Sequence, residues 1–223
     1  MTICLMMHVL TASAQWNVVF VKGNQQSAIP VSIVDSIKPM ASGCFVVFTK
    51  ERTISVPSEW AVFSNNVSDT IVIDYRGNEV FIFNPRLDLF NITADKANVS
   101  IISKSGYPFV CRVTGSSSDG RFVVDADTTM TLVLDGLSLA SQQASAIYLS
   151  QRQKVIVELP TGTASTLQDA NDYHPADSTE TANGCLYARG SLTFTGKGSL
   201  AVTGNYRHGI VSGKNITVEG GRQ

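Results

Sequence analysis

The chain has 223 residues, of which 43% are hydrophobic and 16% charged, and its formal net charge at pH 7 is −1. This length allows one elongated domain with an appendage, or two domains. The near-neutral charge and the lack of a basic run argue against a nucleic-acid-binding protein, and no apolar stretch reaches the ~18 residues of a membrane-spanning helix.

The first residues have the pattern of a signal peptide. Residues 3–10 form a short apolar run, and Ala12 and Ala14 stand before Gln15 in an A-x-A cleavage pattern. We therefore predict that residues 1–14 are a signal peptide and that the protein is exported, to the cell surface, the extracellular space or the periplasm. A buried first strand is the alternative interpretation of the same apolar run.

Residues 15–66 alternate short apolar runs with polar turns and share no period with the rest of the chain. The runs at residues 16–21, 45–48 and 60–63 are typical of strands. We predict a β-rich lead-in here that covers one end of a longer domain, residues 67–223. Residues 70–74 and 79–83 are expected to form the opening coil of that domain.

The second half of the chain repeats with a step of about 24 residues. Val99, Val123 and Ile147 follow this step, and an ungapped match aligns Leu186, Leu192 and Phe194 with Ile210, Ile216 and Val218. Such a period is typical of stacked repeats that cannot bury their apolar faces alone. Within each repeat the apolar residues alternate over four to six positions, as in strands. The pattern predicts an all-β fold, a parallel β-helix.

One step in this series is longer than the others. From Ile147 to Leu186 it is about 39 residues, and the excess falls in the polar segment 167–184. We predict that this segment projects from one edge of the repeats as a loop, on what is often the binding face of a solenoid. At the C-terminal end, the sequence stops just after a predicted strand. We therefore expect that the chain is truncated and that a further domain or a partner covers this end.

Several successive motifs resemble one known family. They are Gly-Ser-Ser-Ser-Asp-Gly-Arg-Phe-Val-Val-Asp at 115–125, Leu-Val-Leu-Asp-Gly-Leu-Ser-Leu at 132–139, and the segments 146–148, 165–169, 198–210 and 215–221. In this order they resemble the calcium-containing, carbohydrate-binding β-helix family of exported bacterial proteins, which is similar in architecture to pectate lyases. The resemblance implies a right-handed, single-stranded parallel β-helix that binds acidic or cellulosic polysaccharide, with bound calcium and no established catalysis.

The acidic residues of the 167–184 segment are the first candidates for a metal site. Calcium prefers six to eight oxygen ligands in a flexible geometry, which a polar loop can supply. The candidate ligands are Asp169, Asp172, Asp177 and Glu180. A solvated acidic loop is the alternative. Asp125 and Asp127 share one face of a strand and form a second candidate pair, for which local capping of backbone amides is the alternative.

Sugar binding requires aromatic faces with planar polar groups beside them. Two loop positions offer this combination: Tyr173 with His174, and Tyr206 with Arg207 and His208. The second is one repeat further on, so we expect it to lie next to the 169–184 loop. Arg207 can also pair with a uronate carboxylate through two parallel hydrogen bonds. A half-buried turn aromatic is the alternative for Tyr206.

Other residues are predicted to be structural. Tyr148 and Tyr187 occupy equivalent positions in two repeats and are expected to stack inside the β-helix. Cys111 and Cys185 lie in strand-like runs without a C-x-x-C pattern, so we expect small buried apolar side chains rather than a zinc site.

The first functional hypothesis is non-catalytic binding of a polysaccharide, pectin-like or cellulosic, with calcium as a possible cofactor and no catalytic residue. The first alternative is a calcium-dependent polysaccharide lyase, in which Arg189, Lys197 or Arg207 would remove the proton beside a uronate carboxylate. The second alternative is a structural or adhesive surface solenoid without glycan affinity.

Overall fold

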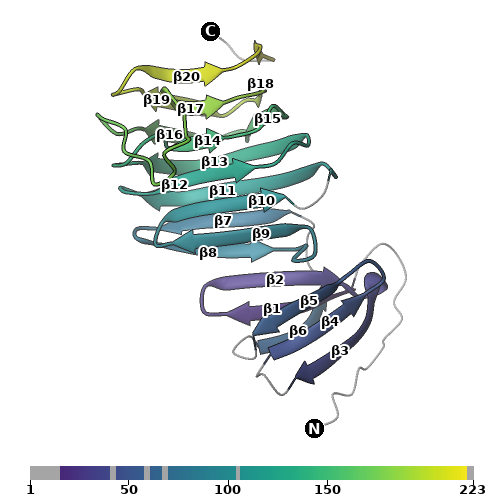
Figure 1. Cartoon of the computed structure of the whole chain (residues 1–223). Coiled ribbons are helices and arrows are strands. Elements are labelled where there is room, and N and C mark those ends of the chain that lie inside the picture. The colour runs from purple at the N-terminus through teal and green to yellow at the C-terminus, as the bar shows by residue number, and fades with distance from the viewer. Residues whose placement is uncertain (1–15, 41–43, 58–60, 67–69, 104–105, 220–223) are drawn as a thin grey trace.

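The computed structural model describes residues 16–40, 44–57, 61–66, 70–103 and 106–219 (Figure 1). The predicted signal peptide and the last four residues lie outside these ranges. The described residues form strands and one short 3-10 helix, Val31–Ile33, and none of them forms a helix long and apolar enough to cross a membrane. The prediction of an all-β fold is therefore confirmed, and most strand pairs are parallel.

The six N-terminal strands pair antiparallel with one another and belong to two sheets, since β1, β2 and β6 end the 12-stranded sheet and the other three form a sheet of their own. β1 (Trp16–Lys22) lies between β2 (Gln25–Pro30) and β6 (Ala61–Asn66), while β3 (Val34–Met40), β4 (Cys44–Thr49) and β5 (Thr53–Pro57) make a separate three-stranded sheet. Buried side chains from both sheets pack into one core: Val18, Phe20, Ile29, Val47 and Val56.

Two hairpins come next, where the sequence predicted an opening coil. β7 (Ile71–Arg76) pairs antiparallel with β8 (Glu79–Asn84), and β9 (Phe90–Asp95) pairs antiparallel with β10 (Asn98–Ser103). A coil of a β-helix would instead place successive strands in different sheets, so that prediction is wrong for residues 70–83. β8 also pairs in parallel with β2 over three residues, which connects the N-terminal strands to the rest of the chain.

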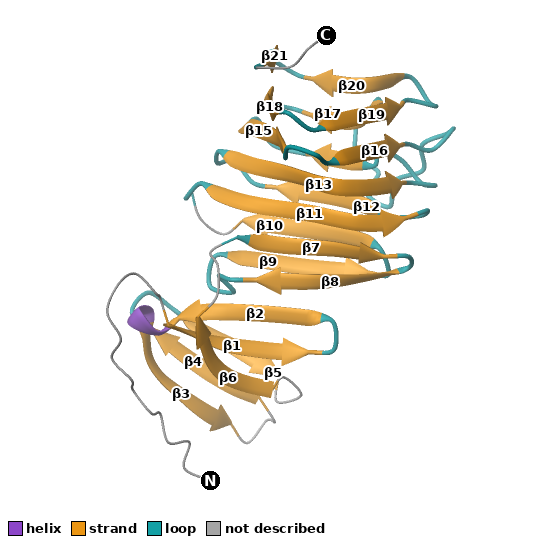
Figure 2. Cartoon of the chain, turned by 180° about the vertical axis from the view of Figure 1, so that it is seen from behind, coloured by secondary structure: helices purple, strands orange, loops and turns teal. Residues whose placement is uncertain are grey.

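From β10 onward the chain passes repeatedly between the same sheets, and each new strand lies parallel to the one a step before it (Figures 1 and 2). We call residues 98–218 the parallel region. One sheet continues from β10 through β12 (Arg121–Asp125), β14 (Ile147–Leu149), β17 (Gly184–Ala188) and β20 (His208–Ser212). A second sheet continues from β7 through β11 (Phe109–Ser117), β13 (Met130–Ala140), β15 (Lys154–Leu159), β18 (Ser191–Gly196) and β21 (Ile216–Val218). The last part of β13 also pairs with β16 (Ala164–Gln168), and β16 pairs with β19 (Ser199–Thr203).

The core of the parallel region consists of columns of apolar side chains that repeat from strand to strand. Leu186 pairs with Ile210 and Ile147 with Leu186, as the repeat predicted. The predicted partner of Val99 is wrong by one residue, since Val99 aligns with Phe122 and not with Val123. A slip of one residue turns a side chain to the other face of the sheet. Phe122 is accordingly 0% exposed, whereas Val123 faces outward and is half-buried.

Glycines stand where neighbouring turns come too close for a side chain. Gly115 and Gly196 both have positive φ, at 82° and 94°. A Cβ at Gly115 would collide with the carbonyl oxygen of Tyr75, and one at Gly196 with that of Leu159. Only glycine adopts a positive φ and leaves room for the neighbouring carbonyl at no steric cost, which explains the residue at both positions.

Candidate functional site

The longest connection of the parallel region runs from the end of β16 at Gln168 to the start of β17 at Gly184. We call residues 169–183 the projecting loop. Ile147 still aligns with Leu186 across this insertion, so the loop leaves and re-enters without disturbing the strand register. It passes near the outward face of β14, because Glu180 and Asp177 both act electrostatically on Tyr148. The prediction of a loop in this part of the chain is confirmed, whereas its course beside β14 was not predicted.

The first contact that holds the projecting loop is made by Asp169, which is 1% exposed. Its Oδ2 accepts a hydrogen bond from the Tyr173 hydroxyl at 2.7 Å, and its Oδ1 accepts one from the backbone N–H of Asn205 at 2.5 Å. The Asn205 side-chain amide donates to the backbone oxygen of Asp169 at 2.8 Å. A buried carboxylate is tolerated only when its oxygens are hydrogen-bonded, and here both are. Asp169 thus joins the loop to the turn after β19.

The second contact is a buried ion pair. The Nη2 atom of Arg121, at the start of β12, lies 2.6 Å from Oε1 of Glu180, and their side chains are 8% and 4% exposed. The Nε–H of Arg121 donates to the backbone oxygen of Ser145 at 2.9 Å. Burial raises the pKa of Glu180 above its ordinary value, and the Arg121 charge opposes this shift. The returning half of the loop is therefore held to the edge of β12.

An aromatic group forms where the projecting loop meets the turn after β19. The rings of Tyr173 and Tyr206 are stacked with centroids 4.3 Å apart and an interplanar angle of 24°. The guanidinium carbon of Arg207 lies 5.0 Å from the centroid of the Tyr206 ring. We call Tyr173, Tyr206 and Arg207 the tyrosine–arginine stack. Burial and the hydrogen bond to Asp169 raise the pKa of the Tyr173 hydroxyl, which stays protonated and keeps its ring in place.

The two predicted sugar-binding positions therefore form one group, although they are 33 positions apart in the chain. Arg207 is exposed and forms no ion pair with a carboxylate in the part of the chain that the structure describes. His174 is also exposed, with its Nε2 3.2 Å from Oδ2 of Asp172. His208 begins β20 and is exposed at the same end of the strands. The cationic side of the group is open to solvent.

The four carboxylates predicted to bind calcium do not share one site. Asp169 and Glu180 hold the loop through the contacts described above, and the Arg121 charge beside Glu180 would repel a cation. Asp177 is exposed, accepts hydrogen bonds from the backbone and hydroxyl of Thr179, and has a lowered pKa for that reason. No group of three or more metal-ligating side chains occurs in residues 16–219 where these are described. The residues present do not fit a single calcium ion in this arrangement.

Asp125 and Asp127, the second candidate pair, lie at the other end of β12 from Arg121, with Asp125 as the last residue of the strand. The Nε2–H of Gln151 donates to Asp125 at 2.7 Å. Both carboxylates line a groove of about 270 Å³ together with Ser103. Two carboxylates alone supply too few oxygens for calcium.

Tyr148 and Tyr187 do stack, but on the outside of the parallel region. They align in neighbouring strands, with ring centroids 5.6 Å apart. Their neighbours Ile147 and Leu149 point inward and are 0% exposed, so the two tyrosines point outward and are half-buried. The predicted interior position is wrong, because strand residues alternate between faces. Cys111 and Cys185, by contrast, are buried free thiols as predicted, and burial raises the pKa of Cys185 to about 12.

Sequence reasoning missed Arg121 and Asn205. Arg121 stands in a motif of the family resemblance, but nothing near it in the chain indicates a partner 59 residues later. Asn205 precedes the predicted Tyr206, and its role depends on the turn that brings it to Asp169. The signal available in the sequence was an arginine at the start of a predicted strand, where a short polar residue would suffice.

Comparisons with known proteins address the same part of the chain. A family model described as "Carbohydrate-binding domain-containing protein" matches residues 95–223. A protein of that description from Acetivibrio thermocellus is 30% identical over 133 residues, which are 58% of this chain and 45% of that protein. A solved structure, that of the polysaccharide lyase-like protein from C. thermocellum as a gadolinium derivative, aligns with a TM-score of 0.56 and 27% identity over 67% of this chain and 57% of that chain. The chain spans about half the length of these relatives.

Proposed function

The chain belongs to the family of carbohydrate-binding domain-containing proteins, and we propose that it binds polysaccharide, without catalysing a reaction on it, through the tyrosine–arginine stack. The observation that carries the proposal is the assembly of Tyr173, Tyr206 and Arg207 from two separate turns. The hydrogen bond from the Tyr173 hydroxyl to the buried Asp169 fixes the position of the Tyr173 ring. A preformed group of this kind binds without a large loss of side-chain entropy.

The chemistry of the stack suits an acidic or hydroxyl-rich ligand. Tyr173 and the Arg207 guanidinium both lie within stacking distance of the Tyr206 ring, and the two tyrosines are half-buried while Arg207 is exposed. Arg207 has no carboxylate partner among the described residues and can donate two parallel hydrogen bonds to a uronate. Exposed His174 and His208 can add hydrogen bonds to sugar hydroxyls. The ligand classes we propose are a pectin-like polyuronate and a cellulosic glycan.

The wider context of the proposal is an exported protein that meets these glycans at the bacterial surface or outside the cell. We propose that the parallel region is a right-handed, single-stranded β-helix, which is supported by the repeated passage of the chain between the same sheets. In such a fold the projecting loop extends from one edge, where a long polymer can reach it without end-on entry.

The site geometry does not support a bound calcium ion, because Asp169 is hydrogen-bonded to Asn205 and Glu180 is paired with Arg121. Glycan retention measured in calcium and in a chelator decides this point. If calcium increases retention, the projecting loop must rearrange to gather its carboxylates around the ion. Equal retention in both conditions would show that the tyrosine–arginine stack acts alone.

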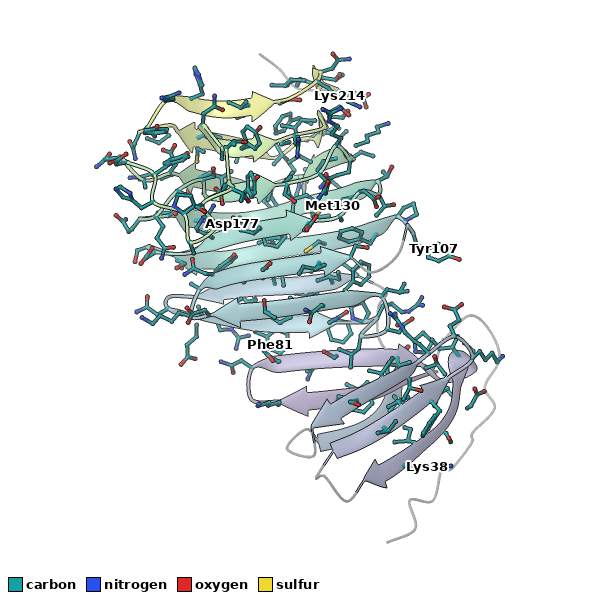
Figure 3. The ribbon with its side chains drawn as sticks, in the orientation of Figure 1. Lys38, Phe81, Tyr107, Met130, Asp177 and Lys214 are labelled. Atoms are coloured by element: carbon teal, nitrogen blue, oxygen red, sulfur yellow. The ribbon has the colours of Figure 1, made fainter. Side chains whose placement is uncertain are left out.

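The direct test is retention on insoluble polygalacturonate and on cellulose. Arg207→Ala and Tyr206→Ala should each reduce retention about tenfold, as expected for the loss of ~1.4 kcal/mol of contact, with the melting temperature nearly unchanged. Arg112→Ala and Tyr107→Ala are the matched controls, because both side chains are largely exposed and Tyr107 lies at another edge of the molecule from Asp177 (Figure 3). If wild-type protein is retained on neither material, the chain is a structural or adhesive solenoid instead.

The similarity to a polysaccharide lyase-like structure makes lyase activity the second candidate. A lyase would release unsaturated uronides, which absorb in the ultraviolet. We expect no such release from polygalacturonate by the wild-type protein with calcium present. Release that disappears in Arg189→Ala, Lys197→Ala or Arg207→Ala would overturn the non-catalytic proposal and identify the base.

A further inference from the structure

A second surface feature begins where the tyrosine–arginine stack ends. β13, β16 and β19 lie side by side, and between their outward side chains runs a shallow groove of about 130 Å³. We call it the three-strand groove. Its outward-facing lining consists of small or uncharged polar side chains: Ser138, Ala140, Thr166, Gln168, Ala201 and Thr203.

The strand register explains why these side chains form two rows. Ser138, Thr166 and Ala201 align across the three strands, and so do Ala140, Gln168 and Thr203. The residues between the rows point inward, as the 1% exposure of Leu139 and Leu167 shows. The Thr166 hydroxyl donates to Oγ of Ser138 at 2.9 Å, which orients the first row. Alanines interrupt the polar residues and let a ligand approach the backbone.

The second row of the three-strand groove lies beside the corner that carries the tyrosine–arginine stack. Gln168 is followed by Asp169, and Thr203 lies two residues before Asn205. The backbone N–H of Asp169 bonds to the Thr203 oxygen at 3.3 Å, and Asn205 bonds to the Asp169 carboxylate. Only the hydrogen-bonded corner formed by Asp169 and Asn205 lies between the groove and the turn that carries Arg207.

The chemistry of the groove differs from that of the stack. No charged side chain lines it. Hydroxyl and amide groups can exchange hydrogen bonds with sugar hydroxyls, but a uronate carboxylate placed there would lose water without gaining a cation, which is costly. Adjacent strands are ~4.8 Å apart, so three strands span about 10 Å, room for two linked pyranose rings.

We propose that the three-strand groove binds uncharged pyranose residues of the same polysaccharide whose end or branch contacts Arg207. This rests on the proposed function and names its ligand class more closely, as a chain with neutral pyranose residues that lies across the strands. Binding then increases with chain length for neutral oligosaccharides. It does not increase for oligogalacturonates, because their carboxylates find no partner in the groove.

The test is calorimetric titration with cellobiose, cellohexaose, digalacturonate and hexagalacturonate. We expect wild-type protein to bind cellohexaose at least about tenfold more tightly than cellobiose, as two or three added neutral hydrogen bonds allow. The two galacturonates should differ by less than about threefold. Thr166→Val combined with Gln168→Ala should weaken cellohexaose binding roughly five- to tenfold and leave cellobiose unchanged.

Two further variants make the result specific. Ala201→Leu fills the groove from an exposed strand position and should have the same effect as the double variant. Thr93→Val removes an exposed strand hydroxyl on β9, far along the chain, and should change nothing. Circular dichroism and melting curves check that all variants are folded.

The outcomes separate the groove from the stack. If cellobiose and cellohexaose bind equally, or if the groove variants weaken both equally, the groove proposal is wrong while the proposed function stands. If Arg207→Ala and Tyr206→Ala leave binding of every oligosaccharide intact, the proposed function fails. If the wild type binds none of the four, both are wrong.

Discussion

The interior of the parallel region and the projecting loop are held in place by different forces. The interior consists of apolar columns in which each side chain contacts many neighbours, and residues such as Phe122, Leu132 and Ile147 are 0% exposed. The loop is held by polar contacts, chiefly Asp169 to Asn205 and Arg121 to Glu180, with backbone hydrogen bonds such as that from His174 to Gln143 beside them. Apolar burial is non-directional and sums over many contacts, whereas these polar contacts depend on single atoms. Damage to the interior should therefore reduce global stability, and damage to the polar contacts should free the loop alone.

The largest expected effect is in the interior. Phe122→Ala removes a fully buried ring from β12 and should reduce the free energy of unfolding by ~3–5 kcal/mol. The control is Val123→Ala, one residue on, whose half-buried side chain faces outward. Denaturant unfolding measures both. A loss for Val123→Ala as large as that for Phe122→Ala would contradict the register that places only Phe122 in the core.

Arg121→Met should have the next largest effect, because it leaves the Glu180 carboxylate buried without a cation. Removing one partner of a buried pair costs ~3–5 kcal/mol when the remaining charge cannot reach water, and a loop that opens lowers this cost. We expect limited proteolysis to cut within residues 169–183 of the variant and not of the wild type. Cleavage accompanied by loss of the whole fold would show that the loop and the interior are not separable.

Tyr173→Phe is a milder change in the same region. It removes the hydroxyl that donates to the buried Asp169, and the unfolding free energy should fall by ~1–3 kcal/mol. Glycan retention should fall with it, because the ring is no longer oriented. Tyr187→Phe, in the outward tyrosine pair, is the control. Unchanged retention by Tyr173→Phe would mean that Asp169 does not position the tyrosine–arginine stack.

The smallest effect concerns pH. Burial raises the pKa of Glu180, so the folded protein holds that proton more tightly than the unfolded chain. The stability that this group contributes is then complete below its unfolded pKa of ~4.3 and declines as the pH rises through its folded pKa. The stability of wild type relative to Glu180→Gln should therefore decrease from pH 4 to pH 7. An increase would show that the Arg121 charge outweighs burial, and Glu158→Gln, an exposed site, supplies the baseline.

The same contrast explains what the sequence could predict. Alternation and a regular step are properties of apolar columns, so the strands, the parallel pairing of Leu186 with Ile210 and the position of the loop were all predictable. The fixed step failed at Val123, because real turns differ in length by a residue and the side-chain period of a strand is two. The predicted opening coil at residues 70–83 was wrong for another reason, because β8 folds back antiparallel on β7.

The candidate site was predictable in its composition and in the placement of the loop beside the Tyr206–His208 turn, but not in the contacts that join the two. Aromatic and cationic residues in turns identified Tyr173, Tyr206 and Arg207 separately, and only the turn geometry stacks them. The acidic residues of the loop suggested a metal, yet two of them are consumed by Arg121 and Asn205. Long-range polar pairs leave no periodic signal in a sequence, so a carboxylate that holds a loop looks the same as one that could hold an ion.

The alignment of Ile147 with Leu186 across the projecting loop has a consequence for how such a protein can change. The strands on either side keep their register although the whole projecting loop lies between them. A new segment can therefore be exchanged at this position without altering the folding of the turns above and below it, provided that it supplies partners for Arg121 and for the Asn205 corner. Under the proposed function, exchange of this loop would replace Tyr173 while leaving Tyr206, Arg207 and the three-strand groove in place.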